Sequence, residues 1–267
     1  MTGLIGYYSA QLRTSLVLQF QYRVAMAIWM IGLIIEPVIY LAVWTAVADS
    51  SGGTVGTFTA GDFAAYYILL LIVQHFTQIW HMWEYDYLIR QGILSGRMLR
   101  PIHPIHRDAA ENMAYKVIMA PVAAAAVIVL ILIFQPTVAI TLEGVLGFIG
   151  ALILAAWLAF MLGWAVAMAA FWTTRIMAIN QMYFVAMFFF SGQIAPLELL
   201  PGVLQTAANI LPFRWMVSFP VEVFMGRLSG SDVLIGFGLQ LLWIALSTGL
   251  VALAWSRGVR RYSAVGG

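Results

Sequence analysis

The chain contains no cysteine and few charged residues. Without cysteine it can form no disulfide, no cysteine-ligated zinc site and no thiol nucleophile. Charged residues make up 9% of its 267 residues and hydrophobic residues 63%, whereas a soluble domain carries about 25% charged residues. The mean hydropathy is +0.93. A chain of this size cannot bury so much apolar surface inside itself, so a lipid bilayer must act as part of its solvent.

The sequence also lacks the motifs of common catalytic sites. It has no GxxxxGK[ST] motif, so we expect no phosphate-binding loop on this chain. Ser191 has no histidine after it and no surrounding GxSxG, which argues against a serine protease. His103 and His106 flank one proline and form only a weak metal pattern. We expect no catalytic residue, no metal site, no cofactor and no nucleic-acid partner.

Long apolar runs predict an all-α membrane protein with six transmembrane helices in a single domain, residues 1–267. About 20 apolar residues cross a bilayer. The predicted spans are residues 24–48, 62–82, 110–134, 144–172, 176–192 and 232–256. The N-terminus shows no short apolar core with a small-residue cleavage site, so no removable signal peptide is expected.

The segments outside the spans have their own patterns. Residues 4–20 repeat apolar side chains every fourth position, which favours an amphipathic helix in the membrane interface; the alternative is the first turns of a longer spanning helix. Residues 49–61 predict a loop. Residues 193–230 contain four prolines among short apolar pieces, which predicts a broken, re-entrant external element. Residues 257–267 predict a cytoplasmic tail.

The distribution of basic residues predicts that both termini are cytoplasmic. With six spans, eleven of the thirteen Lys and Arg residues fall on the inner side, and only Arg214 and Arg227 fall outside. Four aromatic residues stand where the second span would meet the inner interface, and we expect them to anchor it there. They are Trp80, Trp83, Tyr85 and Tyr87.

A polar, basic segment at residues 83–107 separates the second and third spans. Its pattern predicts a short helix at 84–91, a break at Gly92, and a second short helix before Pro101. Apolar residues are mixed with four arginines, as in a surface that docks on another protein. A basic segment that binds anionic lipid headgroups is the alternative.

Glu36, beside Pro37, is an acid inside a predicted span. Such residues usually face a protein interior or a water-filled cavity. Glu36 is therefore either a cavity-facing carboxylate that meets cationic substrate or protons, or a structural partner of Gln74 or His75.

Three motifs resemble those of a known family, the type-2 ABC export permeases, in particular the six-span bacterial group of viologen exporters and daunorubicin-type permeases. LIRQGILSGRMLRPIHPI at 88–105 resembles the family's IRxGxLxxxLLRPxxP segment. SGQIAPLELLPGVLQTAANILPF at 191–213 is similar to its SGxxxPxxxLPxxxxxxxxxLPF element, and GVRRYSAVGG resembles its GxRRYxxxGx ending. Ile93 and Met98 depart from the family pattern.

The resemblance implies a transport subunit without enzymatic activity in the bacterial plasma membrane. Its partners would be a pair of cytoplasmic ATPase subunits, which hold ATP and Mg²⁺, a second permease chain, identical or paralogous, and membrane lipids. Residues 4–20 would be the connecting helix and 83–107 the coupling helix. The coupling residues would be Glu84, Tyr85, Asp86, Arg90, Gly92, Leu94 and Arg97.

The implied cargo is amphipathic or hydrophobic: a drug, a cationic xenobiotic or a lipid. Candidate pathway residues are Glu36, Gln74, Gln78, Gln181, Tyr183 and Phe188. Two other functions compete with export. One is an ABC-type system whose output is signalling or target protection, and the other is an ATP-independent carrier or channel. A carrier built from inverted repeats would show matching interrupted spans in its two halves, and only the fifth span is heavily broken here.

Overall fold

The computed structural model describes residues 2–173 and 175–262 and is almost entirely helical. Four of its helical stretches are long and apolar enough to cross a membrane. They are Ala60–Arg90, Pro104–Phe134, Leu142–Phe171 and Gly230–Arg261. The helix α2 (Arg23–Ser50) adds 28 residues, and α8 (Ile176–Phe190) adds 15, which is about 22 Å of helix. A multi-pass helical membrane protein is confirmed.

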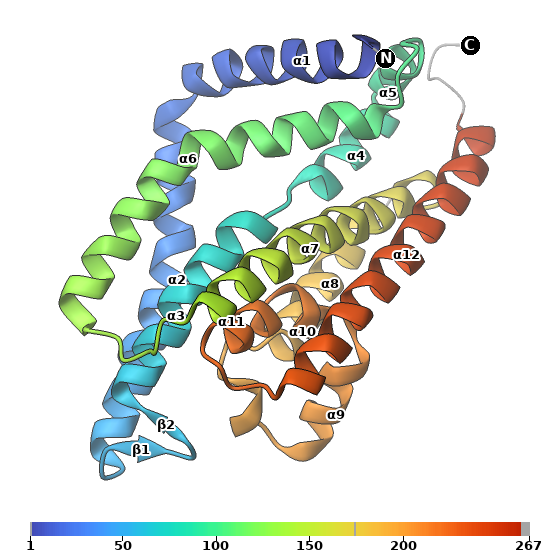
Figure 1. The fold of residues 1–267 in the computed structure, drawn as a ribbon. Helices are drawn as coiled ribbons and strands as arrows, with labels where there is room; N and C mark the ends of the chain where they lie inside the picture. Colours follow the sequence, from blue (N-terminus) through green and yellow to red (C-terminus); the bar gives the residue numbers. More distant parts are fainter. Residues whose placement is uncertain (1, 174, 263–267) are drawn as a thin grey trace.

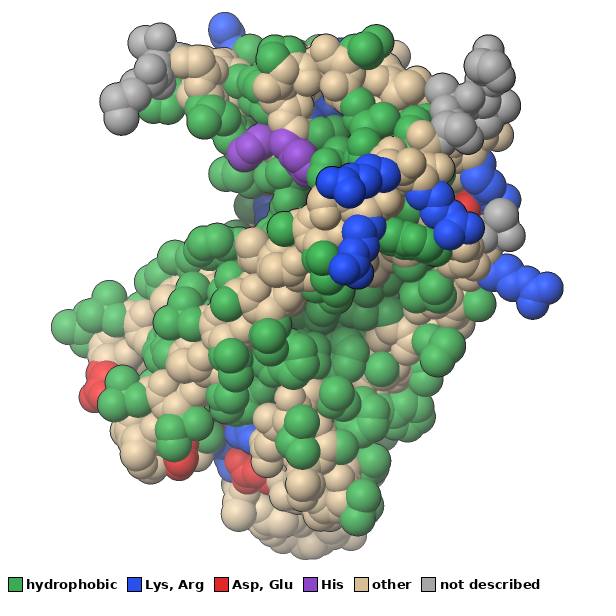
Figure 2. All heavy atoms as spheres, turned by 90° about the vertical axis from the view of Figure 1, so that its right-hand side faces the viewer, with side chains coloured by type: hydrophobic (Ala, Val, Ile, Leu, Met, Phe, Trp, Pro, Cys, Tyr) green, Lys and Arg blue, Asp and Glu red, His purple; other side chains and the backbone are tan. Residues whose placement is uncertain are grey.

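The molecule has two distinct ends (Figure 1). The first, called here the basic end, carries α1 (Thr2–Gln21), α5 (Ile93–Met98) and the C-terminal end of α12 (Gly230–Arg261). The second, called the hairpin end, carries α9 (Gly202–Ile210) and a β-hairpin. Exposed Arg90, Arg100 and Arg257 lie at the basic end, where Figure 2 shows several Lys and Arg side chains together.

At the basic end, α1 runs beside the first part of α6 (Pro104–Phe134) (Figure 1). A turn at Tyr22 separates α1 from α2, so residues 4–20 form a helix of their own. Pro121 lies inside α6, and a proline removes a backbone hydrogen bond and bends a helix. Figure 1 shows α6 bending from the direction of α1 to that of α2.

The predicted second span, 62–82, is interrupted. A capping box between Thr59 and Asp62 begins α3 (Ala60–Thr77), the chain is non-helical at 78–80, and α4 (His81–Arg90) follows. Because no proline or glycine stands at the break, the sequence pattern missed it. Side chains from α6 compensate: Asn112 Nδ2 and Lys116 Nζ donate to the carbonyl of Gln78 at 3.1 and 3.4 Å.

The proline-rich element (193–230) is broken, as predicted. Its pieces are η2 (Leu197–Leu199), α9, α10 (Pro212–Met216) and α11 (Ser218–Phe224). Tyr66 donates to the carbonyl of Gly192, and both Tyr67 and Trp44 donate to that of Ile194. Two carbonyls at the start of this element are thus satisfied inside the protein, as backbone within a membrane requires.

The predicted loop at 49–61 contains a short antiparallel hairpin, β1 (Thr54–Val55) and β2 (Phe58–Thr59). Its Phe58 is buried and stacks on Phe63 at 5.2 Å between ring centroids. The core itself forms where α3, α7 (Leu142–Ala167), α11 and α12 pack together, and η1 (Met168–Phe171) extends α7.

Candidate functional site

The polar segment (83–107) folds as α4, a turn and α5. Gly92 has φ 71°, a left-handed conformation that favours glycine, so the turn after α4 depends on this residue. The segment is then fixed to the start of α6 by Asp108. Tyr85 Oη donates to Asp108 Oδ2 at 2.9 Å, and Arg97 donates to Asp108 Oδ1 at 3.1 Å. Since Asp108 is buried, this contact joins α4, α5 and α6 as one unit.

Three predicted coupling residues lie inside the protein. Tyr85 and Leu94 have no exposed surface, and Asp86 is 8% exposed and ion-paired with Arg90. A direct contact with another protein needs an exposed side chain, and Tyr85 and Leu94 have none in this structure. Their part in coupling stays a prediction. Glu84, Gly92 and Arg97 are half-buried, and Arg90 is exposed. Tyr85 was also expected to anchor the second span at the membrane interface. That expectation is wrong, because its side chain is buried inside the protein.

The exposed face of the segment contains residues that the sequence reasoning did not select. Leu99 is 87% exposed and Tyr87 is 58% exposed. Ile93 and Arg100 are also exposed, together with Arg90, which the sequence reasoning did select. Leu99 is the C-cap of α5, two residues before Pro101, and this proline was the available signal that the chain leaves the helix here. The surface that this segment offers therefore combines apolar and cationic side chains.

The two histidines of the segment make separate structural contacts. His103 Nδ1 accepts the N–H of Ile105 at 3.2 Å and caps α6. Its ring lies 4.4 Å from that of Trp255. Burial, and then the neighbouring His106, lower the pKa of His103. His106 Nδ1 lies 2.8 Å from the hydroxyl of Tyr8 on α1.

Five of the six candidate pathway residues line one cavity of ≈ 380 Å³ between α2, α3 and α8. They are Glu36, Gln74, Gln78, Gln181 and Phe188. Tyr183 is the exception: it is buried against Phe213, with 5.6 Å between ring centroids. The cavity is also lined by Thr77, Phe184, Val185, Met187 and Gln193, which the sequence reasoning did not select.

Glu36 lies on this pathway cavity with Gln74, but no hydrogen bond joins the two among the described contacts. His75 points elsewhere, because its Nε2 lies 3.1 Å from the carbonyl of Lys116 on α6. The Oε1 of Gln74 is buried and has no partner among the described residues. The placement therefore favours a cavity-facing Glu36 over a structural partner of His75.

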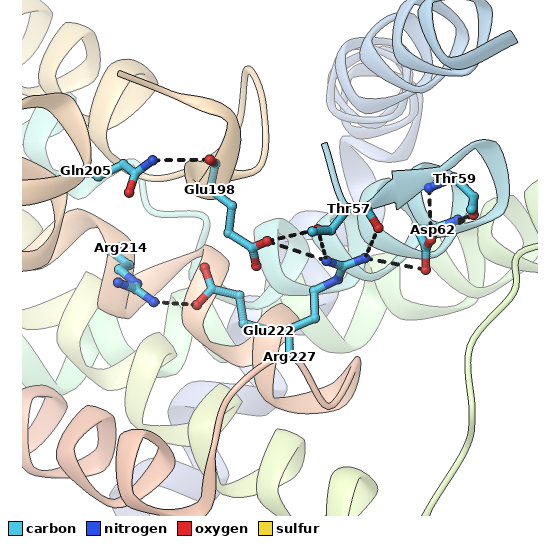
Figure 3. Close-up of polar contacts among 8 residues, drawn as sticks. All are labelled: Thr57, Thr59, Asp62, Glu198, Gln205, Arg214, Glu222 and Arg227. Atoms are coloured by element: carbon cyan, nitrogen blue, oxygen red, sulfur yellow. Dashed lines mark hydrogen bonds and ion pairs between the residues drawn. The ribbon is translucent and has the colours of Figure 1, made fainter. Parts of the chain in front are cut away.

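A third polar group lies at the hairpin end (Figure 3). Arg227 donates to Thr57 Oγ1 at 2.9 Å and forms ion pairs with Asp62 and Glu198 at 3.5 Å each. Its guanidinium lies 3.5 Å from the centroid of the Phe58 ring. This group connects the hairpin, the start of α3 and the proline-rich element.

Arg214 and Glu222 form a separate ion pair of 2.7 Å within the proline-rich element (Figure 3). Both side chains are largely buried, at 18% and 8% exposed. Because each charge of these two groups has a partner, they hold the element together and offer no free charge to a ligand.

Comparison with known families identifies the one to which this chain is similar. The family model described as ABC-2 family transporter protein matches residues 27–266, which include the polar segment, the cavity and the proline-rich element. Neither the curated proteins nor the solved structures give a significant match. The family match covers well over half of the chain. This multi-pass membrane protein therefore belongs to the ABC-2 transporter family, as the permease subunit of an ABC transporter.

Proposed function

We propose that this chain is the permease subunit of a bacterial exporter that moves an amphipathic or hydrophobic substrate across the plasma membrane, with both termini in the cytoplasm. Family membership implies an ABC ATPase as partner. The asymmetry of the basic residues, eleven of thirteen on one side, supports the orientation. In this orientation the basic end, with α4 and α5, would face the ATPase.

The coupling contact is assigned to the exposed face of the polar segment. Leu99 and Tyr87 supply apolar area, and Arg90 and Arg100 supply charge. Apolar anchors give affinity and arginines orient a contact. Tyr85 and Arg97 are both hydrogen-bonded to Asp108 on α6. The polar segment is therefore fixed against α6, so a displacement of α5 by the ATPase is transmitted to α6.

The substrate pathway is assigned to the cavity of Glu36. This single observation carries the proposal: five polar and aromatic residues selected from sequence lie together on one cavity. Glu36 and Gln181 are exposed in the single chain, and a charged group facing lipid is costly. A second permease chain that covers this face, or water in a path between two chains, removes that cost. The pathway then lies between paired permeases.

Replacing Glu36 by Gln tests the pathway directly. The account expects lower ATP-dependent efflux of cationic amphiphiles, with unchanged amounts of the chain in the membrane. A Q181C variant is expected to react with a charged thiol reagent from water, because Gln181 lines the cavity. Met182 is 73% exposed but does not line the cavity, so M182C in lipid is the slow control. Unchanged efflux of every tested cation in E36Q, together with equal labelling of the two cysteines, would contradict the assignment.

A further inference from the structure

A second cavity lies at the basic end, between α1, α6 and the non-helical stretch before α4. It has a volume of ≈ 280 Å³ and shares no lining residue with the pathway cavity. This is many times the space that one water molecule needs. The lining residues are Ser15, Leu18, Gln19, Tyr22, Trp80, Glu84, Glu111 and Tyr115.

Two carboxylates, those of Glu84 and Glu111, line this cavity beside the aromatic side chains of Tyr22, Trp80 and Tyr115. Glu84 makes no hydrogen bond or ion pair with another residue in the described ranges 2–173 and 175–262. Glu111 accepts from Arg107 Nε at 2.7 Å through one oxygen, Oε1. Gln19 donates its Nε2 to the carbonyl of Glu111 at 2.9 Å, which leaves its Oε1 buried and unpartnered among the described residues.

The cationic side chains nearby already have their own carboxylate or carbonyl partners. Arg97 is held by Asp108, and Arg107 by Glu111. Lys116 donates to the carbonyl of Gln78 and to Asn112. The carboxylate of Glu84 is therefore not neutralised by direct contact with any of these three cations.

Aromatic rings form the apolar part of the cavity. Trp80 and Tyr115 meet edge to face with 4.9 Å between centroids, and Tyr22 lines the same space. Aromatic faces attract cations, tryptophan most strongly. A carboxylate without a direct cationic partner, placed among aromatic walls, fits a cation that carries N–H groups.

We propose that this cavity binds the ammonium headgroup of an amphiphile, with Glu84 as its counter-ion and Trp80 as a cation–π partner. The exposed apolar side chains of α1, such as Ile5 at 77% and Val17 at 72%, would lie in the same lipid layer as the amphiphile's tail. Two sources share this chemistry: an amine-headed membrane lipid and an amphiphilic amine solute. The proposal concerns binding and does not depend on transport.

The test is native mass spectrometry of the purified chain, without any ATPase, in detergent. The probes are dodecylammonium, dodecyltrimethylammonium and dodecanol, and phosphatidylethanolamine against phosphatidylcholine. We expect dodecylammonium to bind more tightly than the trimethyl form, because only the former donates hydrogen bonds, and dodecanol to bind weakest. Substitution E84Q is expected to weaken dodecylammonium binding about tenfold, the usual effect of losing one charge-assisted contact.

The control is E143Q, which alters an exposed carboxylate at the first turn of α7 and should leave binding unchanged. If phosphatidylethanolamine displaces dodecylammonium and phosphatidylcholine does not, the natural occupant is the lipid; if neither does, it is a solute amine. Both results support the site. Equal binding of dodecylammonium by the native chain and E84Q, or equal binding of dodecanol and dodecylammonium, would overturn it, whatever the outcome of the efflux experiments with E36Q.

Discussion

Because the chain contains few charged residues, single polar side chains stabilise large parts of the fold. Arg227 is the best example. Its planar guanidinium contacts Thr57, Asp62 and Glu198 and also covers the ring of Phe58. A lysine has one compact charge and cannot reproduce this fork and stacking. The hairpin therefore depends on the identity of this side chain as well as on its charge.

Substitution R227K should loosen the hairpin. Loss of the cation–π contact and of the forked hydrogen bonds removes about 1–2 kcal/mol of local stability at a partly exposed site. Hydrogen exchange of amides 54–59 is then expected to be about tenfold faster. The control is R261K on an exposed residue at the end of α12, which should leave the exchange of the hairpin unchanged. Identical exchange in R227K and the native chain would contradict the role of Arg227.

His103 makes stability depend on pH. Its pKa is lowered from 6.5 by burial and by His106, so the unfolded chain takes up a proton more readily than the folded one. Its stability contribution is present above pH 6.5 and falls as the pH is lowered toward the folded pKa. Protonation also removes the Nδ1 acceptor that caps α6.

Substitution H103N tests this dependence. Asparagine keeps a capping acceptor and does not titrate. Thermal unfolding in detergent, measured from about pH 7.5 to about pH 5.5 around the ordinary histidine pKa, should show a smaller fall in Tm for H103N than for the native chain. Equal pH slopes for the two proteins would show that His103 does not carry the effect.

At the scale of elements, glycines set how closely the helices approach. A Cβ on Gly236 of α12 would lie 2.0 Å from the ring of Phe219 on α11, whereas one on Gly238 would have no neighbour within 4 Å. The two residues share a helix, so the gain in helix propensity from alanine is similar for both. A comparison of alanine at these two positions therefore isolates the effect of packing against Phe219.

Substitution G236A is expected to lower the Tm, because a core that is overpacked by one carbon loses about 1–3 kcal/mol. G238A should leave the Tm unchanged or raise it slightly. Thermal unfolding of both variants in the same detergent provides the comparison. A Tm for G236A equal to that of G238A would contradict this prediction, because it would show that Phe219 can move aside without loss of stability.

The elements also show how far the sequence could be read. Apolar runs predicted the helices, and prolines predicted the broken region after α8. Both signals lie in the sequence of the segment whose structure they affect. The break at 78–80 depends on Asn112 and Lys116, which stand more than thirty residues away, and no local pattern reports such a partner. In the same way, Leu94 appeared available for contact, but the packing of α4 and α5 encloses it.

At the scale of the whole molecule, the chain presents an exposed basic and apolar segment at one end and, between α2, α3 and α8, a cavity lined by polar and apolar residues. Of the sequence-selected pathway residues, only Tyr183 lies away from that cavity. Polar residues in an apolar helix are expensive and so identify a shared face, which is why the cavity could be found from sequence. The exposed face of the polar segment could not, because exposure depends on how the short helices pack.

The most direct test of the account is site-specific crosslinking between this chain and its ABC ATPase. Because the chain has no cysteine, single-cysteine variants have no background. The account predicts that L99C crosslinks to the ATPase, while buried L94C and V203C, exposed by 82% on α9 at the hairpin end, do not. A crosslink from V203C with none from L99C would contradict both the orientation and the docking of the polar segment.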